Sequence, residues 1–269
     1  MSPLSHELLM QACAVPGLTF AVRDAVPSTN TLLRTWAEEG APHGTVLAAS
    51  SQTAGRGRRE RAFFSPDGSG LYLSVLLRPD LPAGEALLLT TCAAVSVALA
   101  LEELTGEAAQ IKWVNDVFFR GRKVCGILTE GALDAATGKL RYAVVGVGVN
   151  VFPPAGGFPP ELADLAGAVF PPERARPGLR EALAGAILER FFSFLPDLRA
   201  RPFFEDYRRR SLVLGRPVLV LERGNSRPAH AIDLTPDFSL LVREEDGTVT
   251  ALSSGEVQVR PGGGGWGEG

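Results

Sequence analysis

The chain has 269 residues, 45% of them hydrophobic, which is enough for one large domain with a small one attached. A formal net charge of −3 argues against general electrostatic attraction to nucleic acid or to an anionic membrane surface. We therefore expect neither a nucleic-acid partner nor a membrane. The three cysteines are scattered and lack metal-ligand spacing, which is typical of a protein in a reducing cytoplasm.

The N-terminal third predicts a short helix over residues 1–17, too polar for a signal peptide, and then a strand. A second helix is expected to begin near Ser28 and to stop at Gly40. Strand-like runs follow at 45–50 and 71–78, and residues 84–105 form the clearest helical pattern. No run approaches the roughly 18 uninterrupted apolar residues of a membrane-spanning helix.

The middle of the chain predicts strands joined in hairpins and then further helices. Strands arriving in hairpins, with helices between the groups, indicate an α+β domain with a mixed or antiparallel sheet flanked by helices. Residues 152–178 are rich in Pro and Gly and predict an irregular segment. The expected strands are 110–114, 117–120, 123–133 and 140–151, and the expected helices are 179–194 and 203–210.

The pattern changes at residue 214. From there to residue 260 about five short β segments alternate with turns, which predicts a small SH3-like β-barrel. We therefore divide the chain into a domain at 1–213, a barrel at 214–261 and a flexible glycine-rich tail at 262–269.

Residues 52–66 (QTAGRGRRERAFFSP) are the most unusual stretch of the chain. They follow a strand and carry Gln52, four arginines including Arg56 and Arg58, and two glycines. Glycine permits positive φ and close approach of the backbone to a ligand, and arginine presents planar donors to carboxylate or phosphate. Taken alone, the four arginines favour a solvated basic loop over a ligand site.

Three other segments have the composition of a ligand site. Ser28, Thr29 and Asn30 are consecutive short polar residues where helix capping needs only one. Lys112 interrupts an apolar strand, where it either meets an anion or faces solvent from a sheet edge. In residues 146–150 (GVGVN), alternating glycines allow a ligand or a second backbone to come close.

Two phosphate-binding motifs are excluded, because no Gly-Lys-Ser/Thr follows Gly57 and no third glycine opens a helix after Gly148. Three histidines, with no paired His or Cys, favour neither a metal site nor a histidine-centred triad. The remaining donors are Arg, Lys and backbone amides. Such a site suits phosphoryl or acyl-phosphate chemistry, in which positioning and charge stabilisation do most of the catalysis.

In order along the chain, these segments resemble the biotin protein ligases. The resemblance covers roughly residues 20–260 and is carried by 28–30 (STN), 52–59 (QTAGRGRR), 64–66 (FSP), 71–74 (LYLS), 112–116 (KWVND), 123–130 (KVCGILTE), 146–151 (GVGVNV) and 254–257 (SGEV). It implies a catalytic domain like that of the class II aminoacyl-tRNA synthetases. It also implies a reaction in which biotin and Mg²⁺-ATP form biotinyl-5′-AMP, whose biotinyl group passes to a lysine of a biotin carboxyl carrier domain.

The resemblance assigns roles to residues by position. Biotin is expected to contact Ser28, Thr29, Asn30, Gln52, Arg56, Gly57, Arg58 and Lys112. ATP is expected to contact Arg56, Arg58, Lys112 and Asn150, with Lys112 and Arg56 as the catalytic pair and the arginine loop as a lid over the adenylate. No protein metal ligand is assigned.

The sequence departs from the family pattern at three places. Phe63 stands where Trp is usual, and Val114 stands where Pro is usual. Only about 17 residues precede the first predicted strand, so we expect no DNA-binding domain and no repressor role. A lipoate or octanoate ligase and a non-catalytic RNA- or nucleotide-binding module remain the competing hypotheses, and an exposed sheet edge permits a homodimer.

Overall fold

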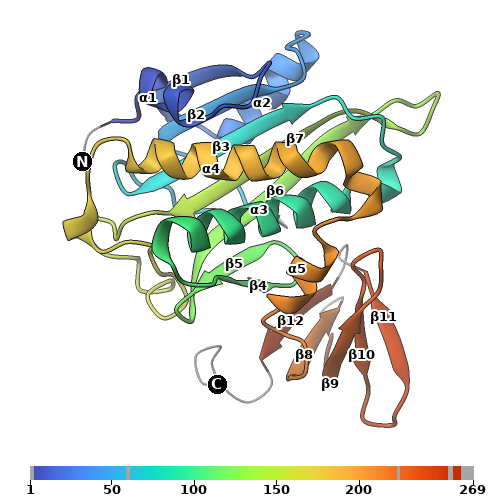
Figure 1. Ribbon diagram of the computed structural model, residues 1–269. Helices are drawn as coiled ribbons and strands as arrows, with labels where there is room; N and C mark the ends of the chain where they lie inside the picture. The colour runs from blue at the N-terminus through green and yellow to red at the C-terminus, as the bar shows by residue number, and fades with distance from the viewer. Residues whose placement is uncertain (1–2, 59–60, 223–224, 254–256, 262–269) are drawn as a thin grey trace.

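A seven-stranded mixed sheet forms the centre of the computed structural model, which describes residues 3–58, 61–222, 225–253 and 257–261. The strand order is β1-β2-β3-β7-β6-β5-β4, with β1 parallel to β2 and the other pairs antiparallel (Figure 1). The strands are β1 (Thr19–Val26), β2 (Thr45–Gln52), β3 (Gly70–Leu77), β4 (Gln110–Lys112), β5 (Asp116–Phe119), β6 (Arg122–Leu133) and β7 (Leu140–Asn150).

Helices cover both faces of this sheet, which confirms the predicted α+β class. The long helices α3 and α4 cross one face (Figure 1), whereas α2 packs against the opposite face. Successive side chains of β3 point to opposite faces of the sheet and so enter different hydrophobic cores. Val75 belongs to the larger core and Leu76 to the smaller core under α2. The helices are α1 (His6–Ala12), α2 (Thr29–Glu38), α3 (Leu87–Thr105), α4 (Leu179–Phe194) and α5 (Phe204–Arg209), with 3₁₀ turns η2 (Ala83–Glu85), η3 (Pro172–Arg174) and η4 (Leu195–Ala200).

Helix α3 is apolar on nearly all sides. The helical stretch Ala83–Thr105 is long and hydrophobic enough to cross a membrane by length and composition, but 72% of its most apolar window is buried within the fold. The helix lies beside α4 on one face of the sheet (Figure 1) and packs against the sheet, α4 and α5, so little of its surface needs to be polar. Gly106, at φ 77°, ends the helix as its left-handed C-cap.

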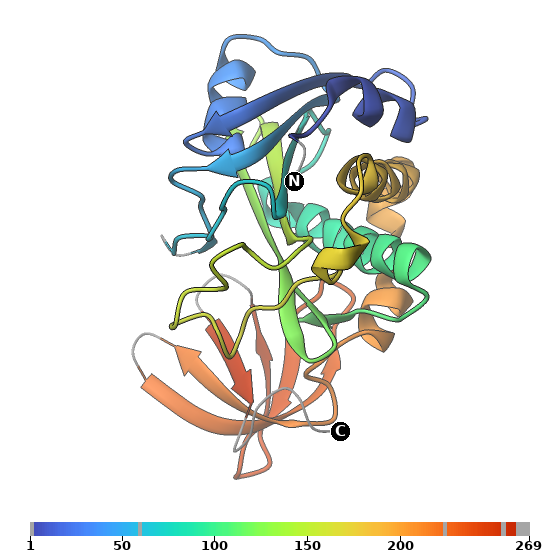
Figure 2. The ribbon, with the colours of Figure 1, turned by 90° about the vertical axis from the view of Figure 1, so that its left-hand side faces the viewer.

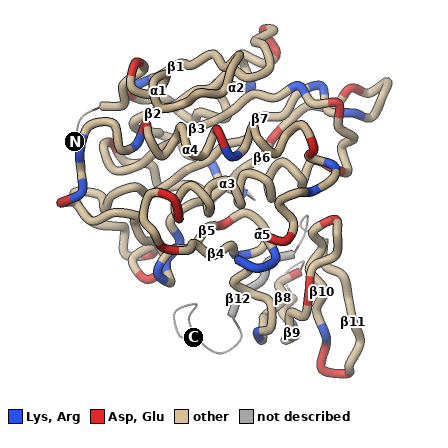
Figure 3. The backbone as a smooth tube through the Cα atoms, in the orientation of Figure 1, with Lys and Arg blue, Asp and Glu red and all other residues tan. Residues whose placement is uncertain are grey.

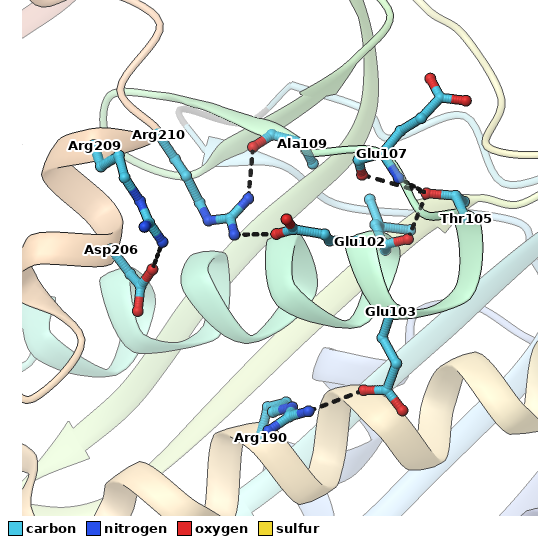
Figure 4. Close-up of polar contacts among 10 residues, drawn as sticks. Glu102, Glu103, Thr105, Glu107, Ala109, Arg190, Asp206, Arg209 and Arg210 are labelled. Atoms are coloured by element: carbon cyan, nitrogen blue, oxygen red, sulfur yellow. Dashed lines mark hydrogen bonds and ion pairs between the residues drawn. The ribbon is translucent and has the colours of Figure 1, made fainter.

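Ion pairs join the C-terminal turn of α3 to the neighbouring helices (Figure 4). Glu103 receives Arg190 of α4 at 3.1 Å, and Glu102 pairs with Arg210, which follows α5. Arg210 is 8% exposed and also donates to the carbonyl of Ala109 at 3.3 Å. Arg210 therefore joins the end of α5 to α3, and each arginine of the run 208–210 pairs with a carboxylate of this chain, which agrees with a structural role.

The C-terminal part forms a second sheet at one end of the molecule (Figures 1 and 2). Its five antiparallel strands have the order β11-β10-β9-β8-β12, so the prediction of five short β segments is confirmed. The prediction of a closed barrel is not confirmed, because the edge strands β11 and β12 do not pair with each other in the described part of the chain. The strands are β8 (Pro217–Glu222), β9 (Asn225–Leu234), β10 (Leu240–Arg243), β11 (Val249–Leu252) and β12 (Val257–Pro261).

A buried aromatic contact joins the C-terminal sheet to α5, and hydrogen bonds extend it to the large sheet. Phe238 of the C-terminal sheet is fully buried, stacks on Phe203 at 5.6 Å and meets the edge of Tyr207 at 5.1 Å. Its backbone carbonyl accepts from Trp113 Nε1 at 2.8 Å, and the Tyr207 hydroxyl donates to the Val114 carbonyl at 3.1 Å. The Trp113–Val114 peptide bond is cis. The β4–β5 turn, which carries the KWVND run, is thus held by the C-terminal sheet.

We expect Phe238→Ala to lower the free energy of unfolding by about 3–5 kcal/mol, because the substitution removes a fully buried ring and leaves a cavity between the C-terminal sheet and α5. Denaturant unfolding measures the change. Val249→Ala is the matched control, since Val249 is 52% exposed in the same sheet and should change stability by less than about 0.5 kcal/mol. Equal losses for the two variants would contradict an anchor at Phe238.

Candidate functional site

A cavity of about 440 Å³ opens between the start of α2, the arginine loop and strands β4 to β7. It contains every predicted site residue except Asn150, so segments spread from residue 28 to residue 148 meet in one place. The lining residues are Ser28, Thr29, Asn30, Gln52, Arg56, Gly57, Arg58, Arg61, Ala62, Phe63, Tyr72, Lys112, Trp113, Asn115, Asp116, Lys123, Gly126, Ile127, Leu128, Gly146, Val147, Gly148, Leu162 and Leu165.

One end of the cavity is neutral and polar, and Asn30 is its centre. The Asn30 amide nitrogen donates to the Leu128 carbonyl at 3.1 Å and to Glu130 Oε2 at 3.0 Å. Both partners are oxygen acceptors, so the amide must turn its nitrogen toward them. The flipped amide would place its oxygen against two other oxygens. Both N–H donors of Asn30 are therefore occupied. Its Oδ1 accepts from Ser74 Oγ at 2.7 Å and keeps a second lone pair for a ligand donor.

Gln52 continues this network to the arginine loop. Its Oε1 accepts from the Thr29 backbone N–H at 2.9 Å, and its Nε2 donates to Ser65 Oγ at 2.9 Å. Ser28 is the N-cap of α2, with its hydroxyl accepting from the Thr31 N–H at 3.4 Å. Of the three consecutive polar residues, only Ser28 caps the helix. The side chains of Thr29 and Asn30, which capping does not need, take part in the hydrogen-bond network of the cavity.

Glycines leave the sheet bare beneath the middle of the cavity. Gly126 and Gly148 lie opposite each other on β6 and β7, and a Cβ on Gly148 would come within 2.5 Å of the Phe63 ring. A Cβ on Gly146 would lie 2.1 Å from Asn30 Oδ1. A close approach occurs at Gly146 and Gly148, but the groups that approach are the Asn30 amide and the Phe63 ring, not the ligand or second backbone that was expected.

The other end of the cavity is cationic. Among the described lining residues, the cations are Arg56, Arg58, Arg61, Lys112 and Lys123, against a single carboxylate on Asp116. Acidic and basic residues are otherwise interspersed along the chain (Figure 3). This local excess of positive charge, in a chain of net charge −3, fits an anionic ligand.

Two side-chain pairs order this cationic end. Lys123 Nζ lies 2.6 Å from Asp116 Oδ1, and both side chains are about three-quarters buried, at 26% and 21% exposure. Arg58 donates to Asn115 Oδ1 at 3.1 Å, and the Asn115 amide nitrogen donates to the Ile127 carbonyl at 2.8 Å. Lys123 lies five residues before Leu128 on β6, roughly 16 Å along an extended strand. The site is therefore long, with a neutral end and a cationic end.

Arg56 reaches across to the neutral end. Its Nη1 lies 2.9 Å from Glu130 Oε1, which Arg34 of α2 also contacts at 3.1 Å. In the described loop, a backbone bridge pairs Arg56 with Ala62. The arginine loop is thus tied to the sheet through one carboxylate of β6.

Burial changes the acid–base behaviour of the tyrosine beside this cavity. Desolvation raises the pKa of the Tyr72 phenol well above its usual range, and its hydroxyl donates to the Pro66 carbonyl at 2.9 Å. Tyr72 therefore stays neutral as a wall residue. Within the described part of the chain, no group of three or more His, Cys, Asp or Glu residues could hold a metal ion.

One expectation about the site is revised, one stays untested, and one arginine of the loop cannot be placed. Asn150 ends β7 outside the cavity lining, and its contact with nucleotide stays a prediction. Gly55 and Gly57 do not have positive φ, so neither is required for a left-handed backbone. Glycine is required at position 55 for lack of space, because a Cβ there would lie 2.4 Å from the Phe63 carbonyl oxygen. Arg61 lines the cavity, whereas Arg59 lies outside the described residues.

Sequence reasoning missed four polar residues that order the site, although each lies in a segment with a signal. Ser74 interrupts an otherwise apolar strand, and Glu130 is an acid in a strand beside the polar helix start. Lys123 and Asp116 lie on paired neighbouring strands. These residues could have been found by the argument used for Lys112, namely that a polar side chain in a buried strand needs a polar partner and is therefore a candidate site residue.

Comparisons with known proteins agree with this geometry. Residues 22–150 match the Biotin/lipoate A/B protein ligase family. The biotin--[acetyl-CoA-carboxylase] ligase of Mycobacterium tuberculosis is 34% identical over 240 residues, covering 86% of this chain and 85% of that protein. The bifunctional ligase/repressor BirA of Bacillus subtilis is 40% identical over 152 residues, which span 56% of this chain and 46% of BirA.

Among solved structures, the biotin protein ligase of Aquifex aeolicus in complex with biotin and ATP superposes with a TM-score of 0.75 at 29% identity. The match covers 91% of this chain and 99% of that chain. The fold and these matches place the chain among the biotin/lipoate protein ligases. The chain belongs to the biotin protein ligase family, although it spans only about half the length of the BirA relatives that it matches.

We expect Asn30→Asp to lower the free energy of unfolding by about 2–3 kcal/mol at pH 7, because a carboxylate replaces the donor that faces Leu128 O and Glu130. These neighbours raise the folded-state pKa of the new carboxyl group. The loss should therefore be full above that pKa and shrink as the pH falls below it.

Denaturant unfolding from pH 7 to pH 4 measures this difference. Gln11→Glu is the matched control, since the amide of Gln11 also donates to a glutamate, Glu7 at 3.3 Å, but at an exposed position. A pH-independent loss at Asn30, or an equal loss at Gln11, would contradict the assigned donors.

Proposed function

We propose that this protein is an ATP-dependent biotin protein ligase. It forms biotinyl-5′-AMP from biotin and ATP and transfers the biotinyl group to a lysine of a biotin carboxyl carrier domain. The observation that carries the proposal is the long cavity with acceptors fixed at one end and cations at the other. Family membership and the complex of the Aquifex aeolicus ligase with biotin and ATP support it.

The neutral end suits the ureido ring of biotin. This ring presents N–H donors and a carbonyl acceptor, and Asn30 can offer a ligand only its oxygen because both amide hydrogens are used. Ser28, Thr29 and Gln52 surround the same point and bind the rest of the ring in this proposal. The Phe63 ring, lying on the glycine floor, supplies the apolar wall beside the ring system.

The cationic end suits the first chemical step. A carboxylate oxygen of biotin attacks the α-phosphorus of ATP, the bond from that phosphorus to the bridging β-phosphate oxygen breaks, and pyrophosphate leaves. Negative charge gathers on the transferring phosphoryl group, where Lys112 with Arg56 and Arg58 stabilises it. Lys123, held by Asp116, adds a cation at the same end. ATP enters as its Mg²⁺ complex.

The second step needs an acceptor amine. The unprotonated lysine of the carrier attacks the acyl carbon of the adenylate, AMP leaves with the bonding electron pair, and the nitrogen loses a proton to solvent as the amide forms. Gly57 and the neighbouring arginines cover the mixed anhydride until the carrier arrives, which limits its hydrolysis. Asn150 is kept as a proposed nucleotide contact near the end of β7.

Further proposals concern the setting of the enzyme. Strands β1 and β4 are the end strands of the large sheet, but Ile111 of β4 already bridges to Ser211, so β1 is the edge that we propose to dock the carrier or a second copy of the chain. An SH3-like fold of the C-terminal domain and a chain division at residue 213 remain part of the proposal. Three buried free thiols support a reducing compartment such as the cytoplasm.

The purified protein should release pyrophosphate from Mg²⁺-ATP only when biotin is present, and it should add one biotinyl group to a biotin carboxyl carrier domain. A coupled pyrophosphate assay and intact-mass spectrometry measure the two steps. Lipoate in place of biotin tests the competing ligase hypothesis. Release with lipoate alone would reassign the substrate, and no release with either acid would favour a binding module.

We expect Lys112→Ala to lower kcat for biotin-dependent pyrophosphate release by about 100- to 1,000-fold, because it removes a cation that stabilises charge developing in the transition state. The KM for biotin should change much less. Lys139→Ala is the control, since Lys139 pairs with Asp80 at 2.6 Å on the surface away from the cavity. Parental turnover by Lys112→Ala would remove Lys112 from the catalytic group.

A further inference from the structure

Glu130 connects the two ends of the cavity without being part of its lining. Its carboxylate receives three donors: Asn30 Nδ2 on Oε2 at 3.0 Å, and Arg34 and Arg56 on Oε1 at 3.1 and 2.9 Å. The Glu130 side chain is only 15% exposed. A carboxylate so enclosed depends on these donors, and it in turn limits where each of them can lie.

At the neutral end, Glu130 determines which atom Asn30 presents. Together with the Leu128 carbonyl it occupies both amide hydrogens, so Oδ1 faces Ser74 and the cavity. An uncharged acceptor at position 130 would hold Asn30 more weakly, because hydrogen bonds to ionised acceptors are stronger than those to neutral ones. The orientation of the amide that meets the ligand is thus set partly by a charge behind it.

At the loop, Glu130 determines where Arg56 lies. The Arg56 side chain is 43% exposed, and an arginine on a loop loses much conformational entropy when it is held in one place. The ion pair at 2.9 Å engages Nη1 and leaves other N–H groups of the guanidinium able to bind an anion. One carboxylate faces two guanidinium groups, so the cluster keeps a net positive charge.

On the basis of the proposed function, we propose that Glu130 is a positioning residue that couples recognition of the biotin ring at Asn30 to the placement of Arg56 over the adenylate. A ligand N–H on Asn30 Oδ1 polarises the amide and strengthens its bond to Glu130. The same carboxylate then holds Arg56, whose remaining donors face the acid end of the ligand. Glu130 touches neither biotin nor ATP.

The test is a double-mutant cycle of Glu130→Gln with Arg56→Ala. The readout is the rate constant for escape of labelled biotinyl-5′-AMP from the preformed complex, chased with unlabelled biotin and ATP. Each single variant should speed escape by about tenfold, and the double variant should be no faster than Arg56→Ala alone. Additive effects, or parental escape from Glu130→Gln, would overturn the coupling.

Arg34→Met is the matched control, because Arg34 pairs with the same oxygen of Glu130 but does not line the cavity. Its escape rate should stay within about twofold of the parent. A tenfold increase in this control would mean that any disturbance of the ion cluster opens the loop, and the assigned role of Glu130 would fall. Glu130→Asp, which keeps the charge, should recover part of the parental rate.

A second measurement needs no change at Glu130, in case its variants do not fold. Biotinamide lacks the carboxylate, so it offers Arg56 no anion. If the coupling holds, Arg56→Ala should still weaken binding of biotinamide by about threefold in calorimetry, through the loosened Glu130 and Asn30. Unchanged binding would overturn it. A parent protein without biotin-dependent pyrophosphate release would instead refute the proposed function, which separates the two failures.

Discussion

The site depends on one constraint, which is that β6 at Gly126 and β7 at Gly146 and Gly148 carry no side chains beneath the start of α2 and the arginine loop. Gly146 admits the Asn30 amide, and Gly126 with Gly148 admits the Phe63 ring. Any Cβ at Gly146 or Gly148 would overlap atoms of these groups. The glycines therefore determine how close the Asn30 amide and the Phe63 ring, which form walls of the cavity, can lie to the sheet. Helix, loop and sheet can form a single site only because of these glycines.

Saturated hydrogen bonding gives the neutral end its selectivity. Both Asn30 N–H donors bind protein acceptors, so this end of the cavity offers oxygen acceptors that are already in place. Preorganised acceptors of this kind reject a ligand without matching donors, because the buried oxygens would then go unpaired. The cationic end is less selective in geometry and more dependent on charge, since flexible Lys and Arg side chains supply it.

The C-terminal sheet belongs to this arrangement through its contact with the β4–β5 turn. Trp113 donates to the Phe238 carbonyl and Tyr207 to the Val114 carbonyl, and both donors are buried. The turn between Lys112 and Asp116 is therefore supported from outside the large sheet. A short hairpin at a sheet edge has few contacts of its own, and this support keeps the cationic end in register with β6.

The sequence by itself determined most of the elements, the α+β class and the main polar residues of the lining. Helix caps, turn residues and strand patterns are local, and the polar clusters at 28–30, 52–58 and 112 are unusual in composition wherever the chain places them. Tertiary structure alone decided which partners these residues meet. Glu130, Ser74 and the Lys123–Asp116 pair act through contacts between strands distant in sequence, and no local periodicity encodes such contacts. The open C-terminal sheet was decided in the same way, because closure depends on whether two edge strands come within hydrogen-bonding distance.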